Sequence, residues 1–383
     1  MKNLLLTVLL AVFTIADGES KNFETAAEAV RHLNPGWNLG NTLDAYNVGI
    51  PAGSPVSAYE TTWGQPVTEE FLMKKVREKG FRCMRIPVTW FQHMDAEGNV
   101  DRAWMDRVEE VVGYVLKNDM YCILNVHHDT GAHPSAWIQA DSGRFAGTRD
   151  RYERLWTQIA TRFRDYDERL LFEGYNEMLD TAFTWSAPKE RASLQAVNSY
   201  AQLFVNTVRA TGGNNLQRNL VVTTYSGAHG GEWGNTPYVL SDFRVPTDPC
   251  GNQNHLAVEV HSYDPFDWVN TYNMTWTQQC SDELGRIFQR LNDAFISKGY
   301  PVIVGEFGSN GAGEKTINGR STAQQQAEAG RQAADMVRRC RQHGAAAIYW
   351  TLLVDGTDRR QESFRWSIET VADSLVSTAN KPL

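Results

Sequence analysis

Three things are scarce in this sequence of 383 residues: cysteine, positive charge and long apolar runs. Lysine and arginine number 37 against 45 aspartates and glutamates, which gives a formal net charge of −8. An acidic surface argues against nucleic acids and anionic membranes as partners. Beyond the N-terminal segment, no stretch approaches the ~20 apolar residues that a transmembrane helix needs. We therefore expect no nucleic-acid partner and no membrane anchor, and we expect a monomer.

The one apolar run lies at the N-terminus. Lys2 precedes an apolar segment over residues 4–15, and Ala16 and Gly18 are small residues at positions −3 and −1 of a cleavage site after Gly18. This pattern is typical of a secretory signal peptide. We predict that residues 1–18 are a signal peptide, that residues 19–383 form one folded domain, and that the protein is secreted and extracellular.

Five cysteines are an odd number for an exported protein. Cys83 and Cys122 fall in apolar, strand-like runs and Cys340 in a helical stretch, so we expect these three to be buried thiols. Cys250 and Cys280 fall in polar, loop-like segments and are the candidate disulfide. Closing a loop of that length would stabilise the fold by about 3–4 kcal/mol.

The chain shows no Pro/Ser/Thr-rich linker, no charge block and no appended repeat. Instead, short runs rich in Val, Ile and Leu alternate with amphipathic stretches, as in buried parallel strands and their covering helices. The predicted strands are Trp37–Gly40, Cys83–Pro87, Cys122–Val126, Leu170–Tyr175, Leu220–Thr224, Leu256–Val260, Val302–Gly305 and Ala346–Trp350. The predicted helices are Thr68–Lys79, Trp104–Asn118, Arg151–Phe163, Ala192–Ala210, Ser281–Lys298 and Thr322–His343. Eight strands favour an α/β fold, a closed (β/α)₈ TIM barrel in a single domain, over a doubly wound sheet.

Polar side chains gather where the predicted strands end. In a barrel the C-terminal ends of all strands meet at one face, which is where active sites form. The polar and aromatic residues at these ends include Asn41, Arg85, His127, His128, Asn176, Glu177, His261, Tyr263, Glu306 and Trp350. The pattern predicts one site at that face.

Glu177 and Glu306 stand out because each closes an apolar strand, where a carboxylate is costly unless it is paired, protonated or open to a cleft. The simple alternative is that each forms a structural salt bridge. Two carboxylates at matching ends of separate strands are better suited to glycoside hydrolysis, in which one acid protonates the leaving oxygen while a carboxylate attacks or activates water.

The chain resembles glycoside hydrolase family 5, the cellulase family. Its matching motifs follow the family's order across nearly the whole chain: Gly36–Asp44, Arg85–Trp90, Asn125–His128, Tyr175–Glu177, His261–Tyr263, Gly305–Gly308 and Ile348–Trp350. One departure follows Glu177, where many members carry proline and this chain has Met178. Because this departure alters the loop after Glu177, the resemblance does not say how the leaving-group side of the substrate is bound.

The resemblance implies a retaining double displacement, with Glu177 as acid/base and Glu306 as nucleophile. It implies that Arg85 and Tyr263 hydrogen-bond Glu306. On this basis we expect Glu306 to titrate low and Glu177 to titrate higher.

The resemblance also implies the substrate-binding residues. Asn176 would hold the sugar 2-hydroxyl, Trp350 would stack on a pyranose, and His261 would also influence the proton affinity of Glu177. His128 either contacts sugar or only orients a loop. The full set is Arg85, His127, His128, Asn176, His261, Tyr263, Trp350 and Asn41.

The residues leave two other classes of function open. A metal-dependent hydrolase is suggested by the run His127-His128-Asp129 together with His261. However, His127 and His128 are neighbours on an extended segment, where side chains point opposite ways, which disfavours joint chelation. We therefore expect no metal and no cofactor. A carbohydrate-binding barrel would keep the aromatics but has no need of the carboxylate pair.

The substrate is expected to be a β-linked polysaccharide. The opening motif, Gly36–Asp44, resembles the cellulase branches of the family most. The resemblance implies an endo-β-1,4-glucanase acting on cellulose or related β-glucans, with β-mannanase and xyloglucanase as alternatives. Residues 227–235 form a plausible substrate-contacting loop. A stacking track is expected from a few of Trp63, Trp90, Trp137, Trp185 and Trp268.

Overall fold

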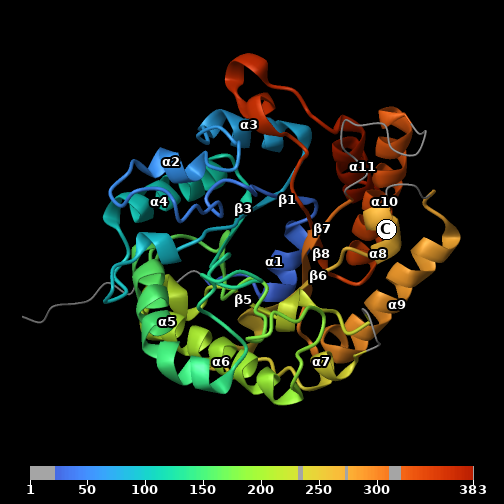
Figure 1. Cartoon of the computed structure of the whole chain (residues 1–383). Coiled ribbons are helices and arrows are strands. Elements are labelled where there is room, and N and C mark those ends of the chain that lie inside the picture. The colour runs from blue at the N-terminus through green and yellow to red at the C-terminus, as the bar shows by residue number, and fades with distance from the viewer. Residues whose placement is uncertain (1–21, 232–235, 272–274, 310–320, 383) are drawn as a thin grey trace, which may run out of the picture.

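Eight parallel strands close into a barrel in the computed structural model, which describes residues 22–231, 236–271, 275–309 and 321–382 (Figure 1). Each strand pairs with its neighbours in sequence, and β8 pairs back onto β1. The strands are β1 (Gly36–Asn38), β2 (Cys83–Ile86), β3 (Tyr121–Asn125), β4 (Leu170–Glu173), β5 (Leu220–Thr223), β6 (Leu256–His261), β7 (Val302–Phe307) and β8 (Ala346–Tyr349). All eight predicted strands are present with slightly shifted ends, and the predicted TIM barrel is confirmed.

Helices surround the barrel in an outer ring (Figure 1). The six predicted ones are α3 (Glu70–Lys79), α4 (Arg102–Lys117), α5 (Ser142–Arg162), α6 (Leu194–Ala210), α9 (Gln278–Ala294) and α10 (Thr322–Gln342). Helix α5 begins earlier than predicted because the Asp141 carboxylate caps it by accepting from the Arg144 N–H. Five further helices were not predicted from the sequence: α1 (Ala26–His32), α2 (Val56–Glu60), α7 (Tyr238–Ser241), α8 (Phe266–Thr271) and α11 (Glu369–Ala379). Among the described residues, no helix is both long and apolar enough to cross a membrane.

Helix α1 closes the N-terminal end of the barrel and appears at the centre of the ring in Figure 1. Its Ala26 and Val30, with Leu33 just beyond it, pack against inward-facing side chains from the strands. Those side chains are Cys83, Ile123, Leu171, Val221, Ala257, Ile303, Ala346 and Ile348. They fill the interior at the N-terminal end of the barrel, so that part of the barrel is a packed core rather than a pore.

Two residues further along the strands, the barrel interior becomes polar. The register pairs Asn38 with Arg85 across β1 and β2, and Thr223 with Glu259 across β5 and β6. Because side chains alternate between the two faces of a strand, these residues point inward above the apolar layer. This polar layer lies directly beneath the C-terminal face of the barrel, and we call it the floor.

The predicted disulfide is wrong, because Cys250 and Cys280 are both free. Cys250 is exposed in a turn that precedes β6, at the N-terminal end of the barrel. Cys280 is buried in the first turn of α9, which begins at the opposite end, and its Sγ lies 3.3 Å from Thr277 Oγ1. The barrel height separates the two thiols. The other three cysteines are buried, as predicted.

Candidate active site

A cavity of about 750 Å³ opens at the C-terminal ends of the strands. Among its lining residues are most of the predicted site residues: His127, His128, Glu177, His261, Tyr263, Glu306 and Trp350. Arg85 and Asn176 lie beneath them and are almost wholly buried. The strand ends therefore bring together side chains that are up to about 265 residues apart in the chain.

Arg85, on β2, joins the floor of the cavity to the carboxylates above it. Its Nε and Nη2 donate to the two oxygens of Glu173 at 2.7 and 2.8 Å. Its Nη1 donates to Glu306 Oε1 at 2.9 Å, and Nη2 also donates to Asn176 Oδ1 at 2.8 Å. Nη2 lies 3.2 Å from Glu259 Oε1 as well. A planar guanidinium suits this task because its donors have fixed directions.

Glu306, on β7, receives a donor on each oxygen. Arg85 bonds Oε1, and the Tyr263 hydroxyl donates to Oε2 at 2.9 Å. Burial nevertheless raises the pKa of Glu306 above its ordinary value, although His261 and Arg85 oppose the shift. The expectation that Glu306 titrates low is therefore wrong: sequence motifs reveal the donors but not the depth at which the carboxylate is buried.

Glu177 lies beyond the end of β4, with a side chain 20% exposed to the cavity. Its Oε1 is 2.8 Å from Nδ1 of His261, and that same Nδ1 is 3.7 Å from Glu306 Oε2. One oxygen of Glu177 and one of Glu306 lie within 4.8 Å of each other and of the His261 ring. The two carboxylates therefore face a single space.

His127 and His128 lie side by side, with ring centroids 4.5 Å apart. The expectation that these neighbours point away from each other is therefore wrong, because the segment leaves the extended β3 at Asn125 and turns. Burial lowers the pKa of both imidazoles, that of His128 to about 3, so both are neutral. Together with Asp44 they form a group whose ligand atoms could converge on a metal ion.

Trp350 stands against the cavity with its ring stacked on His127, at a centroid distance of 5.6 Å. Asn41 is absent from the residues that line this cavity. It lines an adjoining hollow of about 470 Å³, which also contains Trp350 and Tyr263. Asn41 has a positive φ of 60°, which Asn tolerates better than most residues.

The predicted tryptophan track reduces to two exposed rings. Trp185 is 47% exposed and lines the cavity, and Trp63 is 36% exposed and lies beside His128. Trp90 and Trp268 are buried, so they belong to the core. Trp137 is half-buried, and its Nε1 donates to Asp129.

The predicted 227–235 loop reaches the cavity through Gly227, His229 and Gly231. Residues 232–235, which include Trp233, lie outside the described part of the chain, as does the predicted signal peptide. His229 Nε2 lies 2.6 Å from Asp264 Oδ2, which also accepts from the Ser262 hydroxyl at 3.0 Å. Hydrogen bonds thus connect this loop to the segment that follows β6.

Sequence reasoning missed two buried acids of the floor, Glu173 and Glu259. Both are wholly buried, and both lie within strands that are otherwise apolar. A carboxylate inside a buried strand was the signal that would have found them, because such a group needs a partner. Asn38 and Asn125 complete the floor by bonding Arg85 and Glu173.

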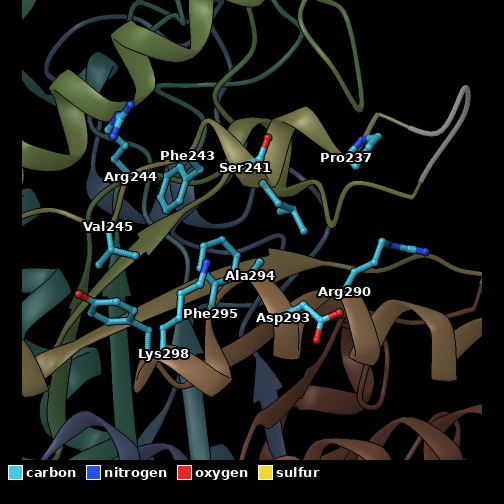
Figure 2. Close-up of a pocket in the computed structure, with 12 residues that line it drawn as sticks. Pro237, Ser241, Phe243, Arg244, Val245, Arg290, Asp293, Ala294, Phe295 and Lys298 are labelled. Atoms are coloured by element: carbon cyan, nitrogen blue, oxygen red, sulfur yellow. The ribbon is translucent and has the colours of Figure 1, made fainter.

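A second hollow, of about 530 Å³, lies outside the barrel between α7 and α9 (Figure 2). Phe243 and Phe295 form part of its wall, and Arg244 and Lys298 lie at its rim. Asp293 is the one carboxylate among its lining residues. The lining of this hollow therefore lacks the two carboxylates that glycoside hydrolysis needs.

A (β/α)₈ barrel with two carboxylates at the C-terminal ends of β4 and β7, in a cleft with exposed aromatic rings, defines a glycoside hydrolase. The chain belongs to glycosyl hydrolase family 5. Residues 44–356 match the model of the family described as "Cellulase (glycosyl hydrolase family 5)".

Solved structures agree with this assignment. A family 5 enzyme from Prevotella bryantii B14, a mutant in complex with a xyloglucan tetradecasaccharide, is 46% identical with a TM-score of 0.85, over 94% of this chain and 99% of that one. A broad-specificity endoglucanase from an uncultured bacterium is 39% identical with a TM-score of 0.83, over 93% and 96% of the two chains. Endoglucanase A of Clostridium longisporum is 34% identical over 301 residues. The match covers 76% of this chain but about half, 54%, of that relative.

Asp44 gives a prediction for stability against pH. Its Oδ1 accepts the Thr42 N–H at 2.8 Å, its Oδ2 has no hydrogen-bond partner, and burial raises its pKa to about 6. The folded state binds this proton more tightly than the unfolded chain, so the stabilisation is present at low pH and is lost as pH rises through about 6. Asp44→Asn replaces the charged form with a neutral amide. We expect the variant to gain stability relative to the parent between about pH 4 and about pH 7.

Urea unfolding of the parent and of Asp44→Asn, at about pH 4 and about pH 7, measures the difference in their free energies of unfolding. Asp150→Asn is the control, because the Asp150 side chain is 90% exposed, and its stability should follow that of the parent. If the free energies of unfolding of Asp44→Asn and the parent differ by the same amount at the two pH values, the folded protein does not bind a proton at Asp44 as predicted.

Proposed function

We propose that the chain is a secreted, retaining endo-β-1,4-glucanase, with Glu177 as acid/base and Glu306 as nucleophile. The observation that carries the proposal is the separation of the two carboxylates, whose facing oxygens lie within 4.8 Å. Retaining glycosidases hold the carboxyl groups about 5–5.5 Å apart, whereas inverting enzymes need about 6.5–9.5 Å to admit a water molecule. The short separation supports direct attack by Glu306.

In the first half-reaction, Glu306 attacks the anomeric carbon as the glycosidic bond breaks. Glu177 transfers its proton to the leaving oxygen, becoming a carboxylate. Arg85 and Tyr263 hold the Glu306 oxygens in place before attack. Because Asn176 uses its Oδ1 to accept from Arg85, its Nδ2 donors are left for the sugar 2-hydroxyl.

In the second half-reaction, Glu177 removes a proton from water, whose oxygen attacks the anomeric carbon and releases Glu306 as a carboxylate. The sugar leaves with its original configuration, and Glu177 is again protonated. Burial raises the pKa of Tyr263, so its hydroxyl remains a donor throughout. Trp350 supplies an apolar face for the pyranose in both steps.

For the substrate, we propose a β-1,4-glucan backbone, with xyloglucan as a second candidate. The Prevotella enzyme, at 46% identity over 94% of this chain, was solved with a xyloglucan oligosaccharide. The exposed Trp185 and Phe266 also line the cavity and offer stacking surfaces for further sugar units. β-Mannan remains the third substrate to test.

Two substitutions test the catalytic assignment. Glu306→Gln removes the nucleophile and Glu177→Gln removes the transferable proton, and we expect each to lower kcat on soluble β-glucan by about 10²–10⁴-fold or more. Glu60→Gln is a matched control, because Glu60 is a buried acid paired with Arg107 outside the cavity. A reducing-end assay measures all three. Near-normal turnover in either active-site variant would refute the assignment.

Product stereochemistry and substrate preference form a second test. Time-resolved proton NMR should detect the β-anomer as the first product, because two inversions restore the configuration. We expect reducing ends from soluble β-1,4-glucan and from xyloglucan, and fewer from mannan. Initial release of the α-anomer would contradict the retaining mechanism, and release from mannan alone would contradict the proposed substrate.

Export and oligomeric state are part of the same proposal. The basic start, the apolar run and the small residues before the predicted cut support removal of residues 1–18 and function outside the cell, where we propose that the protein acts as a monomer. N-terminal sequencing of the exported protein should begin at Glu19, and light scattering should give the mass of one chain. An exported chain that retains its first residues would contradict the predicted cleavage.

A further inference from the structure

His261 touches a carboxylate at each ring nitrogen. Nδ1 lies 2.8 Å from Glu177 Oε1, and Nε2 lies 3.1 Å from Glu259 Oε1. A carboxylate oxygen, or the carbonyl oxygen of a protonated carboxyl group, accepts but does not donate, so an imidazole with hydrogen on both nitrogens satisfies both contacts. In line with this geometry, the carboxylates Glu306, Glu177 and Glu259 raise the pKa of His261 well above its ordinary value despite burial. His261 is therefore an imidazolium that links the cavity to the barrel floor.

Glu259 lies on β6 at the centre of the polar layer, and several charged or titratable groups face it. Arg85 on β2 contacts its Oε1 at 3.2 Å, and Cys83 on the same strand interacts with it electrostatically. From β4, Glu173 lies close enough for its pKa to rise to about 7, through burial and through repulsion from Glu259. Below that pH Glu173 therefore holds a proton, which reduces the repulsion between the two acids. We refer to Glu173 and Glu259 as the carboxyl pair.

Gly305 on β7 makes room for this arrangement. A Cβ at that position would lie 1.7 Å from Glu259 Oε1. Even alanine at position 305 would therefore displace the acid from His261. The residue before the proposed nucleophile is small because the Glu259 side chain occupies the adjacent space.

We propose that Glu259 is a positioning residue for the acid/base: by accepting from His261 Nε2–H, it keeps the imidazolium donating through Nδ1–H to Glu177 Oε1. The proposal rests on the proposed function, since it gives Glu259 a part in the same reaction. With Oε1 occupied by that donor, the acid proton of Glu177 is confined to the other oxygen, which is free to face the glycosidic oxygen. Without a hydrogen on Nδ1, the Glu177 hydroxyl would donate a hydrogen bond to that nitrogen and would not face the glycosidic oxygen.

The arrangement also keeps the buried charge balanced through both half-reactions. Before attack, Arg85 and His261 are cations, Glu306 and the carboxyl pair each carry one negative charge, and Glu177 is neutral. After attack, Glu306 is an ester and Glu177 is charged, so the balance is unchanged. A net charge in a buried site is costly. This balance therefore allows Glu177 to transfer its proton while His261 and the carboxyl pair keep theirs.

Leaving-group dependence tests the proposal, because general-acid assistance matters only for a poor leaving group. Glu259→Met keeps the length of the side chain but cannot accept from Nε2–H. We expect its kcat/KM to fall about 100-fold on soluble β-glucan but to stay within about threefold on 2,4-dinitrophenyl β-cellobioside, which needs no acid. Glu259→Gln keeps an acceptor oxygen, and we expect both values within about threefold of the parent.

Two controls separate positioning from general damage. Tyr263→Phe removes a donor from Glu306, and we expect kcat/KM to fall on both substrates. Asp248→Asn breaks the buried pair with Arg209 elsewhere in the barrel, and any loss should be equal on both substrates. If Glu259→Met lowers kcat/KM equally on both substrates, or on neither, Glu259 has no specific part in acid catalysis and the proposal is wrong.

A direct measurement needs no substrate. Nitrogen-15 NMR of the nine histidines, with His261 assigned by loss of its signal in His261→Asn, reports the protonation of the ring. At pH 8 we expect an imidazolium in the parent and in Glu259→Gln, and a neutral ring in Glu259→Met. An imidazolium that persists in Glu259→Met would overturn the proposal. This readout is independent of whether the protein cleaves β-glucan, so failure of the proposed function would appear separately.

Discussion

One guanidinium among three buried carboxylates is the constraint on which the active site depends. Arg85 bonds Glu173 and Glu306 directly and lies 3.2 Å from Glu259. A single buried cation cannot offset three anions, and an unbalanced buried charge costs several kcal/mol. The remaining negative charge must therefore be neutralised by two protons. One is held by the carboxyl pair and the other by His261. The positions of those protons connect the barrel floor to the proposed acid/base.

This constraint also explains why the site is rigid. Arg85 on β2 contacts groups from four other strands, β1, β4, β6 and β7, so the same bonds hold the barrel interior together and align the reacting groups. Fixed donors near developing charge need little reorganisation during reaction. Burial keeps the nearby His127 and His128 neutral and Tyr263 protonated. The cavity therefore presents polar contacts to a sugar with little added charge.

Aromatic side chains line the cavity above the floor, some of them packed together and others exposed. Trp350 and His127 form a stacked wall next to Glu306, while Trp63 lies beside His128 and Trp185 lies on the cavity wall. These exposed rings are on loops, which vary more readily than the strands beneath them. The chemistry is thus fixed by the barrel interior, while substrate choice depends on loops that the interior does not constrain.

The sequence by itself determined the eight strands, most of the ring of helices and the residues of the catalytic motifs, because apolar periodicity and local motifs are properties of neighbouring residues. It did not determine the depth of burial: Glu306 titrates higher than its donors suggest, Cys250 and Cys280 lie at opposite ends of the barrel, and Trp90 and Trp268 are core residues. It also missed the carboxyl pair, since Glu173 and Glu259 become partners only when β4 and β6 pair on either side of β5 in the closed barrel. Local sequence specifies which groups can react, whereas protonation depends on neighbours and burial that only the folded barrel supplies.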